Sequence, residues 1–260
     1  MKLINILICL ITLIPLNLSA ETPEEKGLAL AIETDKRNTG WIDQYAEMTM
    51  TLRNRQGQES IRKLEMKSKE VEADGDKSLS IFDTPKDVKG TAFLSYTHSL
   101  EADEQWLYLP ALKRVKRISS SNKSGPFMGS EFAYEDLTSY EVEKYTYKWL
   151  RDEILDGRDV YVIELYPAYE NSGYTRQIIW MDKEMYQPLK VEFYDRKDSL
   201  LKTLTHLDYK KYLDSYWRPD SMHMVNNQNG KETTLDWSNY KHKNEFTDRD
   251  FDKNTLKKAR

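Results

Sequence analysis

The chain has 260 residues, and its 39 Lys and Arg against 43 Asp and Glu give a formal net charge of -4. This balance argues against a general nucleic-acid binder, because such proteins carry a marked basic excess. Charged residues make up 32% of the chain, yet 17 Tyr, 7 Phe and 6 Trp supply ample aromatic surface for a core. A single apolar stretch approaches the length of a membrane span, and it lies at the N-terminus, which excludes a protein with several spans.

Residues 1–20 are typical of a cleaved secretory signal. Lys2 precedes an apolar run, and Leu18, Ser19 and Ala20 place small residues before Glu21. The alternative is an uncleaved anchor, but the run is shorter than the roughly 20 residues of a span. The only cysteine, Cys9, lies in this run without the small residues that precede a lipidated cysteine. We therefore expect a periplasmic protein that is not lipidated and whose mature chain has no disulfide.

The mature chain begins with the signals of a helix. Thr22 is a suitable N-cap and Pro23 suits the first helical position. Leu28, Ile32 and the neighbouring alanines suggest an apolar stripe, and Asn38 and Gly40 follow as stop signals.

From residue 48 the apolar residues recur with a period of two, which predicts strands. Turn sequences separate them, and Asp156-Gly157 is a strong hairpin signal. About eleven strands without helices between them predict a mainly β (α+β) fold with one antiparallel sheet, which at this size must curl or close.

Residues 119–140 differ from the strands around them. Phe127, Met128, Phe132 and Tyr134 place four large apolar groups in eight residues, and Gly125 and Gly129 are candidate hinges. A long segment between two strands is often a lid over a binding site. The alternative is a fixed plug that packs against the sheet.

A cationic hairpin precedes this segment. Lys113, Arg114, Lys116 and Arg117 place four cations in five residues, which suits transient contact with an anionic membrane or an acidic partner. The alternative is a sheet edge protected by charge.

The sequence contains no catalytic or metal-binding pattern. His98, His206, His223 and His242 are not at metal-ligand spacing, and neither a nucleophile elbow nor a phosphate-binding glycine loop is present. We therefore expect no enzyme activity, no metal and no cofactor, although an enzyme with a site formed only in space stays a third possibility.

Three linked stretches resemble a bacterial family. They are PKDVKGTAFL at 85–94, WLYLPALKRV at 106–115, and FMGSEF at 127–132 followed by Glu135-Asp136-Leu137. In this order they resemble the outer-membrane lipoprotein-sorting proteins with a LolA-like domain, and the resemblance covers essentially all of residues 21–260 as a single domain. LolA itself is shorter and lacks the Phe-Met-Gly-Ser stretch.

The resemblance implies a strongly curved antiparallel half-barrel, LolA/LolB-like, whose concave face is covered by helices. It also implies an apolar cavity for the acyl chains of a lipid or lipoprotein, and an inner-membrane exporter of the resistance-nodulation-division (RND) superfamily as partner.

The residues that would line this cavity are assigned from the alternation of the strands. They are Met48, Met50, Leu52, Leu64, Met66, Leu79, Ile81, Leu107, Leu109, Ile178, Trp180, Val191 and Phe193. A bulge would exchange the two faces of a strand, and a closed core without a cavity is the alternative. The expected function is a periplasmic carrier or chaperone for acyl chains that serves transfer between membranes, with a non-transporting adaptor of an exporter as the alternative.

Overall fold

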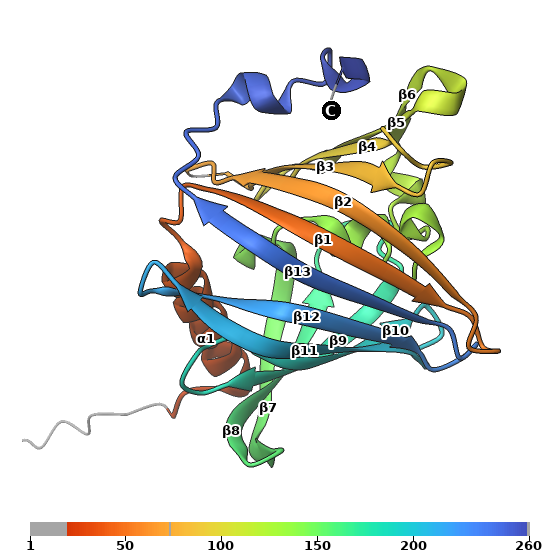
Figure 1. The fold of residues 1–260 in the computed structure, drawn as a ribbon. Helices are drawn as coiled ribbons and strands as arrows, with labels where there is room; N and C mark the ends of the chain where they lie inside the picture. Colours follow the sequence, from red (N-terminus) through yellow and green to blue (C-terminus); the bar gives the residue numbers. More distant parts are fainter. Residues whose placement is uncertain (1–19, 73, 259–260) are drawn as a thin grey trace, which may run out of the picture.

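The computed structural model describes residues 20–72 and 74–258 (Figure 1). The expected signal peptide, apart from Ala20, lies outside these residues. None of the helices in the described ranges is long and apolar enough to cross a membrane.

The helix α1 (Pro23–Asn38) begins as the sequence predicts. The Thr22 hydroxyl accepts from the Glu25 backbone N–H at 3.1 Å, and the Glu25 carboxylate accepts from the Thr22 backbone N–H at 2.8 Å. The predicted stripe is wrong for Leu28 and Ile32, which are 43% and 52% exposed, whereas the neighbouring Ala31 is buried. The buried face instead contains Gly27, where an added Cβ would lie 2.9 Å from the backbone nitrogens of residues 148 and 149. The absence of a side chain at residue 27 lets α1 pack directly on the sheet.

Thirteen strands form one antiparallel sheet over the described ranges. They are β1 (Asp43–Arg53), β2 (Glu59–Lys69), β3 (Lys77–Thr84), β4 (Ala92–Tyr96), β5 (Glu104–Leu109), β6 (Arg114–Ile118), β7 (Tyr145–Leu155), β8 (Arg158–Pro167), β9 (Tyr174–Asp182), β10 (Pro188–Asp195), β11 (Leu200–Tyr212), β12 (Tyr216–Asn226) and β13 (Glu232–His242). Their order is β6-β5-β4-β3-β2-β1-β13-β12-β11-β10-β9-β8-β7. Two meanders therefore meet at the β1–β13 pair, and β6 and β7 are the edges.

The strand count exceeds the expected eleven, partly because β4 has no clear alternation. Ala92, Phe93 and Leu94 are all buried, since Phe93 packs on one face of the sheet and its two neighbours on the other. A strand that is covered on both faces has a continuous apolar run in its sequence. A search for alternating apolar residues therefore misses it.

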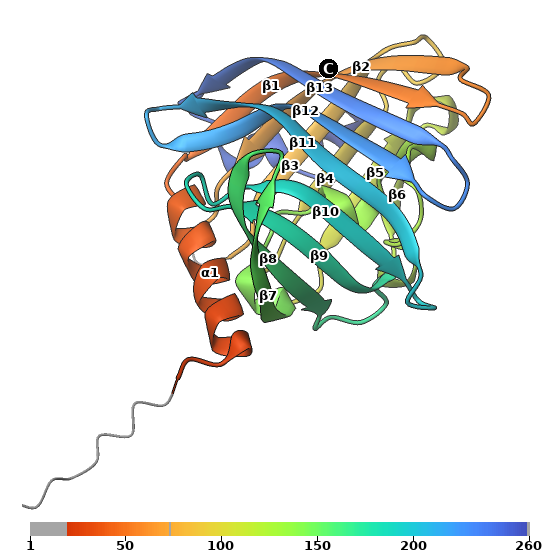
Figure 2. The same ribbon diagram turned by 90° about the horizontal axis from the view of Figure 1, so that it is seen from below.

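The sheet is strongly curved, and the segment between the edge strands lies on its inner side (Figures 1 and 2). We call residues 119–144 the middle segment. It contains four 3₁₀ helices: η2 (Ser120–Asn122), η3 (Phe127–Gly129), η4 (Tyr134–Leu137) and η5 (Val142–Lys144). The remaining 3₁₀ turns are η1 (Pro110–Leu112), η6 (Asp248–Phe251) and η7 (Leu256–Lys258). Among the described residues, only short 3₁₀ helices of the middle segment, rather than the longer helical cover that the resemblance implies, lie against the concave face, while α1 lies beside β7 (Figure 2).

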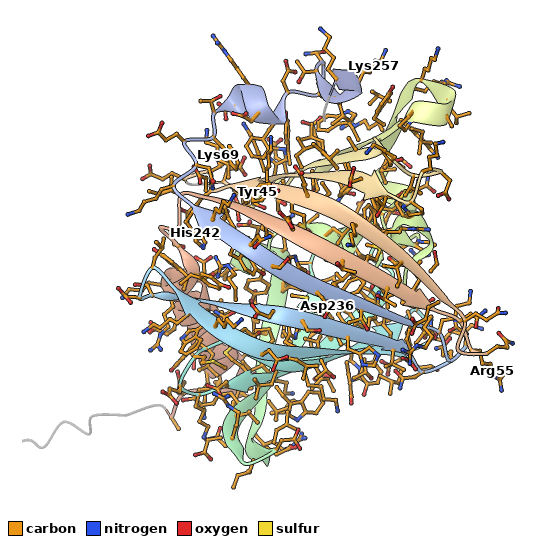
Figure 3. The ribbon with its side chains drawn as sticks, in the orientation of Figure 1. Tyr45, Arg55, Lys69, Asp236, His242 and Lys257 are labelled. Atoms are coloured by element: carbon orange, nitrogen blue, oxygen red, sulfur yellow. The ribbon has the colours of Figure 1, made fainter. Side chains whose placement is uncertain are left out.

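The outer face carries a cover of its own over β3 to β6. We call residues 243–258 the C-terminal segment, and its Phe251 and Leu256 are 0% and 2% exposed. They pack with Leu79, Ile81 and Trp106 in a cluster separate from the inner core. In Figure 3, Lys257 marks this segment and Arg55 marks the β1–β2 turn.

Candidate functional site

A cavity of about 380 Å³ lies between the concave face of the sheet and the middle segment. Ligand pockets in proteins commonly measure about 300–1,000 Å³, so this inner cavity is at the small end of that range. Its apolar lining includes Trp41, Met48, Met50, Met66, Phe93, Phe127, Phe132, Leu137, Met222, Leu235 and Trp237. Four of these are methionines, whose flexible side chains adapt to irregular apolar ligands.

Nine of the thirteen residues assigned to the lining lie on the inner side of the sheet. Met48, Met50 and Met66 line the cavity. Six others belong to the inner core around it, either buried or packed against it: Leu52, Leu64, Leu107, Leu109, Val191 and Phe193.

The assignment of Leu79 and Ile81 has the wrong face. Both pack under the C-terminal segment on the outer side. The inner positions of β3 are Ser78 and Ser80, which line the cavity, and Phe82, which packs in the inner core. Because the C-terminal segment covers the outside of β3, its more apolar face points away from the cavity.

Ile178 and Trp180 are also on the other face. They pack with Val160 and Val162 in a separate cluster, whereas Ile179 contacts the inner core. Here too both faces of the strand are covered, so alternation alone could not identify the inner one.

The polar part of the lining was not anticipated from the sequence. Arg218 and His206 line the cavity together with Gln44, Gln187 and Tyr209, beside the serines of β3. The strand period of two places His206 on the same face as Leu204, so a signal for His206 existed. Arg218 lies close to the β11–β12 turn, and no comparable pattern marks it.

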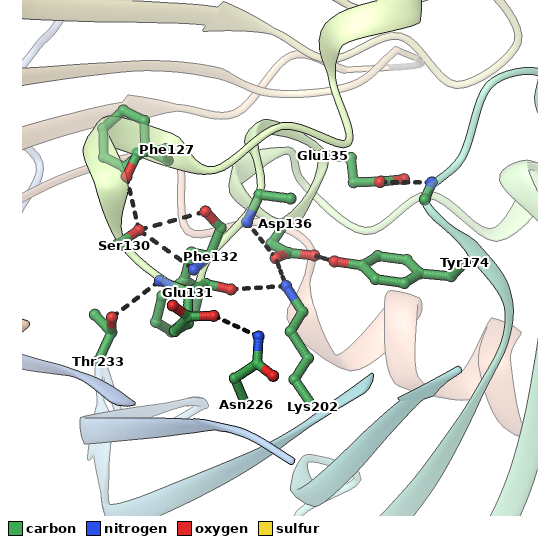
Figure 4. A network of polar contacts seen from close by, with 12 residues as sticks. Phe127, Ser130, Glu131, Phe132, Glu135, Asp136, Tyr174, Lys202, Asn226 and Thr233 are labelled. Atoms are coloured by element: carbon green, nitrogen blue, oxygen red, sulfur yellow. Dashed lines mark hydrogen bonds and ion pairs between the residues drawn. The ribbon is translucent and has the colours of Figure 1, made fainter. Parts of the chain in front are cut away.

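The middle segment is held to the sheet by buried polar contacts (Figure 4). The Lys202 ammonium lies 2.6 Å from the Asp136 carboxylate, and the two side chains are 4% and 7% exposed. The same ammonium donates to the Glu131 carbonyl at 2.9 Å, and the Tyr174 hydroxyl donates to Asp136 at 2.8 Å. Removing one member of a buried ion pair is costly, so these contacts fix the segment in place.

Further contacts anchor the segment on both flanks. The Asn226 amide donates to the Glu131 carboxylate at 2.7 Å, and the Gln105 amide donates to the Tyr134 carbonyl at 2.9 Å. The Glu135 carboxylate accepts from the backbone N–H of residue 173 at 2.8 Å. Burial raises the pKa of Glu135, and this hydrogen bond opposes the shift.

The aromatic anchors of the segment point into the inner core. Phe127 and Phe132 are 1% and 3% exposed, and Phe127 packs against Phe93 with ring centroids 5.1 Å apart. Tyr134 contacts the rings of Phe93 and Phe127. Met128 is partly buried and packs against the core. The four large apolar residues of this segment therefore face the sheet.

The cationic hairpin lies at an edge of the sheet, on η1 and β6. Lys113, Arg114, Lys116 and Arg117 are exposed, as is Leu112 at the turn. Arg117 pairs with Glu104 at 3.1 Å, while Lys113, Arg114 and Lys116 have no carboxylate partner among the described residues.

An acidic cleft of about 680 Å³ adjoins the cavity and shares four residues with it: Asn38, Trp41, Asp76 and Ser139. Its carboxylates are Asp35, Glu70, Glu72, Asp74, Asp76, Glu141 and Glu143. Burial, reinforced by neighbouring carboxylates, raises the pKa of Asp76 and of Glu141 to about 7. No cluster suited to hold a metal ion is present in residues 20–72 and 74–258.

Several proteins of known structure share this architecture. A family model described as "uncharacterized protein" matches residues 74–258. An outer membrane lipoprotein-sorting protein domain of Vibrio parahaemolyticus has a solved structure that is 58% identical, covers 90% of this chain and 99% of its own, and superposes with a TM-score of 0.89. A DUF1329 family protein of Desulfovibrio piger is 33% identical, with 90% and 99% coverage and a TM-score of 0.85.

A LolA superfamily protein of Nitrosomonas europaea shares the fold at 21% identity, with 88% and 98% coverage and a TM-score of 0.71. The search of curated proteins finds no match. The 58% identity over nearly the whole domain, together with the curved sheet and inner cavity, leads to one conclusion: this chain belongs to the family of outer membrane lipoprotein-sorting proteins.

Proposed function

We propose that the protein is a periplasmic carrier that holds an acyl chain of a lipid or lipoprotein in the inner cavity during transfer between membranes. The observation that carries this proposal is the methionine-lined cavity between the sheet and the middle segment. Each buried CH₂ group of a chain contributes about 0.8 kcal/mol, so such a cavity can supply most of the binding free energy.

The size of the cavity restricts the cargo in this conformation. At about 380 Å³ it suits one chain better than several. A cargo with several acyl chains would require Phe127 and Phe132 to leave the inner core, which exposes two nearly buried aromatic rings.

The contacts of the middle segment favour a fixed plug for residues 127–136. The pair of Asp136 with Lys202 and the pair of Lys144 with Asp103 both lie in buried surroundings. Residues 137–143 lie between these two pairs and border both the cavity and the acidic cleft. We therefore place the mobile part of the cover in this short stretch, and a lid that includes 127–136 stays a prediction to be tested.

The cationic hairpin is the proposed contact with a membrane. Lys113, Arg114 and Lys116 surround the exposed Leu112, and this combination suits an anionic lipid surface. An RND-superfamily exporter as a second partner rests on the family resemblance.

A non-transporting adaptor is the second candidate function. The observation that favours it is the exposed pair Leu28 and Ile32, which lie one helical turn apart on α1. An adaptor would use this surface to dock and would not need the cavity.

Native mass spectrometry after gentle periplasmic extraction separates the two functions. A carrier should retain bound lipid, whereas an adaptor should show only the mass of the polypeptide. Binding of a fluorescent fatty acid gives the second test: Met66→Glu places a charge in the cavity and should weaken uptake. Lys67→Glu is the matched control, because Lys67 is the next residue on β2 and lies on the outer face near Phe246. Equal uptake by both folded variants would contradict the carrier proposal.

A further inference from the structure

The inner cavity contains a partly buried cation, Arg218, without an ionic partner among the described residues. Arg218 Nε donates to the Gln44 side-chain carbonyl at 3.1 Å, and Nη1 donates to the Asn38 side chain at 2.7 Å and to the Trp217 carbonyl at 2.9 Å. These partners are all neutral, and Nη2 makes no hydrogen bond within the described ranges. Burial lowers the pKa of Arg218, but a guanidinium stays protonated in proteins.

A second polar group on the same wall also lacks a partner. His206 is 8% exposed and lines the cavity, and its Nδ1 has no hydrogen-bond partner among the described residues. Burial lowers the pKa of His206 to about 4, so the ring is neutral at pH 7 and keeps one N–H donor. Buried polar atoms are nearly always hydrogen-bonded in native proteins, so an unpaired one beside a cavity indicates a missing partner.

The other charges that line the cavity do not satisfy Arg218. Asp136 is already neutralised by Lys202 at 2.6 Å. Asp76 interacts with Arg218 only at longer range and forms no ion pair with it in the described ranges. Because the pKa of Asp76 is about 7, its carboxyl group is partly protonated at neutral pH. A cationic headgroup would be repelled by Arg218, whereas an anionic headgroup would supply the ionic partner that Arg218 lacks.

We propose that Arg218 forms the polar end of the inner cavity and binds the anionic headgroup, a carboxylate or a phosphate, of a single-chain lipid. His206 lies opposite Met222, further along the same wall, and is an unpaired polar group beside the acyl chain. The acyl chain then lies along the methionine wall formed by Met48, Met50, Met66 and Met222. This inference rests on the proposed function and adds the chemistry of the headgroup. It makes Arg218 a determinant of specificity, since the apolar wall alone does not distinguish an acid from an alcohol with the same chain.

The test compares dodecanoate, dodecyl phosphate and dodecanol, measured by displacement of a fluorescent fatty-acid probe. The wild-type protein should bind at least one of the two anions about tenfold more tightly than the alcohol, because hydrogen bonds to charged groups are stronger than neutral ones. Arg218→Gln should abolish this preference while the affinity for dodecanol changes by less than about threefold. Lys211→Gln removes an exposed cation of the neighbouring strand outside the cavity and should leave the preference intact.

The outcomes distinguish a failure of the carrier function from a failure of the headgroup inference. If neither dodecanol nor the two anions bind, the carrier function fails. If all three bind equally well to the wild type, or if Arg218→Gln keeps the preference, only the headgroup inference fails. The relative affinity for dodecanoate and dodecyl phosphate identifies the headgroup. Circular dichroism checks the fold, and if Arg218→Gln does not fold, dodecylamine provides a comparison in the wild-type protein. Its cationic headgroup should bind at least about threefold more weakly than dodecanol, and equal or tighter binding would overturn the inference.

Discussion

Two irregular segments cover the two faces of the sheet, and they are held in different ways. The middle segment lies on the inner face and is fixed by buried polar contacts, with Asp136 and Lys202 at their centre. The C-terminal segment lies on the outer face. Its start is held by the buried Asp43 carboxylate, which accepts from the backbone N–H groups of Asn244 and Phe246, and its part over β3 to β6 is held by Phe251 and Leu256. Its ion pairs are peripheral, since Asp248, which contacts Lys69 and Lys77, has a side chain that is 70% exposed.

The difference suggests why a cavity can persist on the inner side. Every apolar contact lowers the free energy of the folded state. A segment held by apolar side chains therefore packs until the space beneath it is filled. Buried ion pairs and hydrogen bonds have one favourable geometry, so they can hold a cover at a fixed distance. On this interpretation, the polar anchors of the middle segment keep the inner cavity open.

The largest expected effect comes from breaking the central pair of the inner cover. Asp136→Ala leaves the Lys202 ammonium buried without its counter-charge and should lower the free energy of unfolding by about 3–5 kcal/mol. Urea unfolding measures this. The double variant Asp136→Ala with Lys202→Met should recover most of the loss, because no charge is then left buried. A loss below about 1 kcal/mol in the single variant would show that the pair does not hold the segment.

The part of the outer cover that lies over β3 to β6 should depend mainly on apolar burial. Phe251→Ala should cost about 3 kcal/mol of unfolding free energy, because the ring is fully buried. Uptake of a fluorescent fatty acid by the folded variant should not change, since Phe251 lies in a cluster separate from the inner core. Phe127→Ala is the matched variant of the inner cover, and it should alter uptake as well as stability. Reduced uptake in Phe251→Ala would remove the functional distinction between the two covers.

Asp76 should link stability to pH at the junction of the cavity and the acidic cleft. Its pKa is about 7 in the folded protein against an ordinary 3.8, so the folded state binds the proton more tightly than the unfolded state. The stabilising contribution is therefore complete below about pH 4 and is lost as the pH rises to 7. At about 1.4 kcal/mol per pKa unit, Asp76→Asn should stabilise the protein at pH 8 by on the order of 2 kcal/mol, with little effect at pH 4.

Thermal unfolding at several pH values checks this. Asp156→Asn is the control, because Asp156 is exposed at the β7–β8 turn. Parallel pH profiles for the wild type and Asp76→Asn would contradict the expectation.

The smallest effect is expected in local dynamics, without a change in global stability. On addition of dodecanoate, hydrogen exchange should slow in residues 137–143, while residues 127–136 keep their protection. The reason is that 137–143 lies between two buried ion pairs and borders the cavity. The C-terminal segment should not respond and serves as the internal control. A change that also extends over residues 127–136 would show that these residues belong to the mobile lid.

The sequence predicts the strands and turns well because local signals determine them. The Thr22 cap and the Asp156-Gly157 hairpin form as expected. The errors arise where distant segments cover a strand. Leu79, Ile81, Ile178 and Trp180 obey the strand period but face other clusters, because both sides of their strands are buried. Which side holds the cavity is decided by where the covers pack.

The polar end of the cavity could not be predicted for a related reason. Arg218 is ordinary in sequence, and its significance comes from Asn38 on α1 and Gln44 on β1, which reach it from the other end of the chain. The resemblance to the family supplied the cavity as an expectation but not its polar residues.

The pairing of β1 with β13 also has a consequence for how the chain acquires its fold. Met50 lies opposite Leu235, and Gln44 lies opposite His242, so the two central strands come from opposite ends of the sequence. A chain that emerges from its N-terminus can form the β1–β6 meander early, but β1 has no partner on its second side until the last strand is made. Contacts of such large sequence separation slow folding. The edge of β1 must therefore remain unpaired for most of synthesis, and this edge is where a chaperone would be needed.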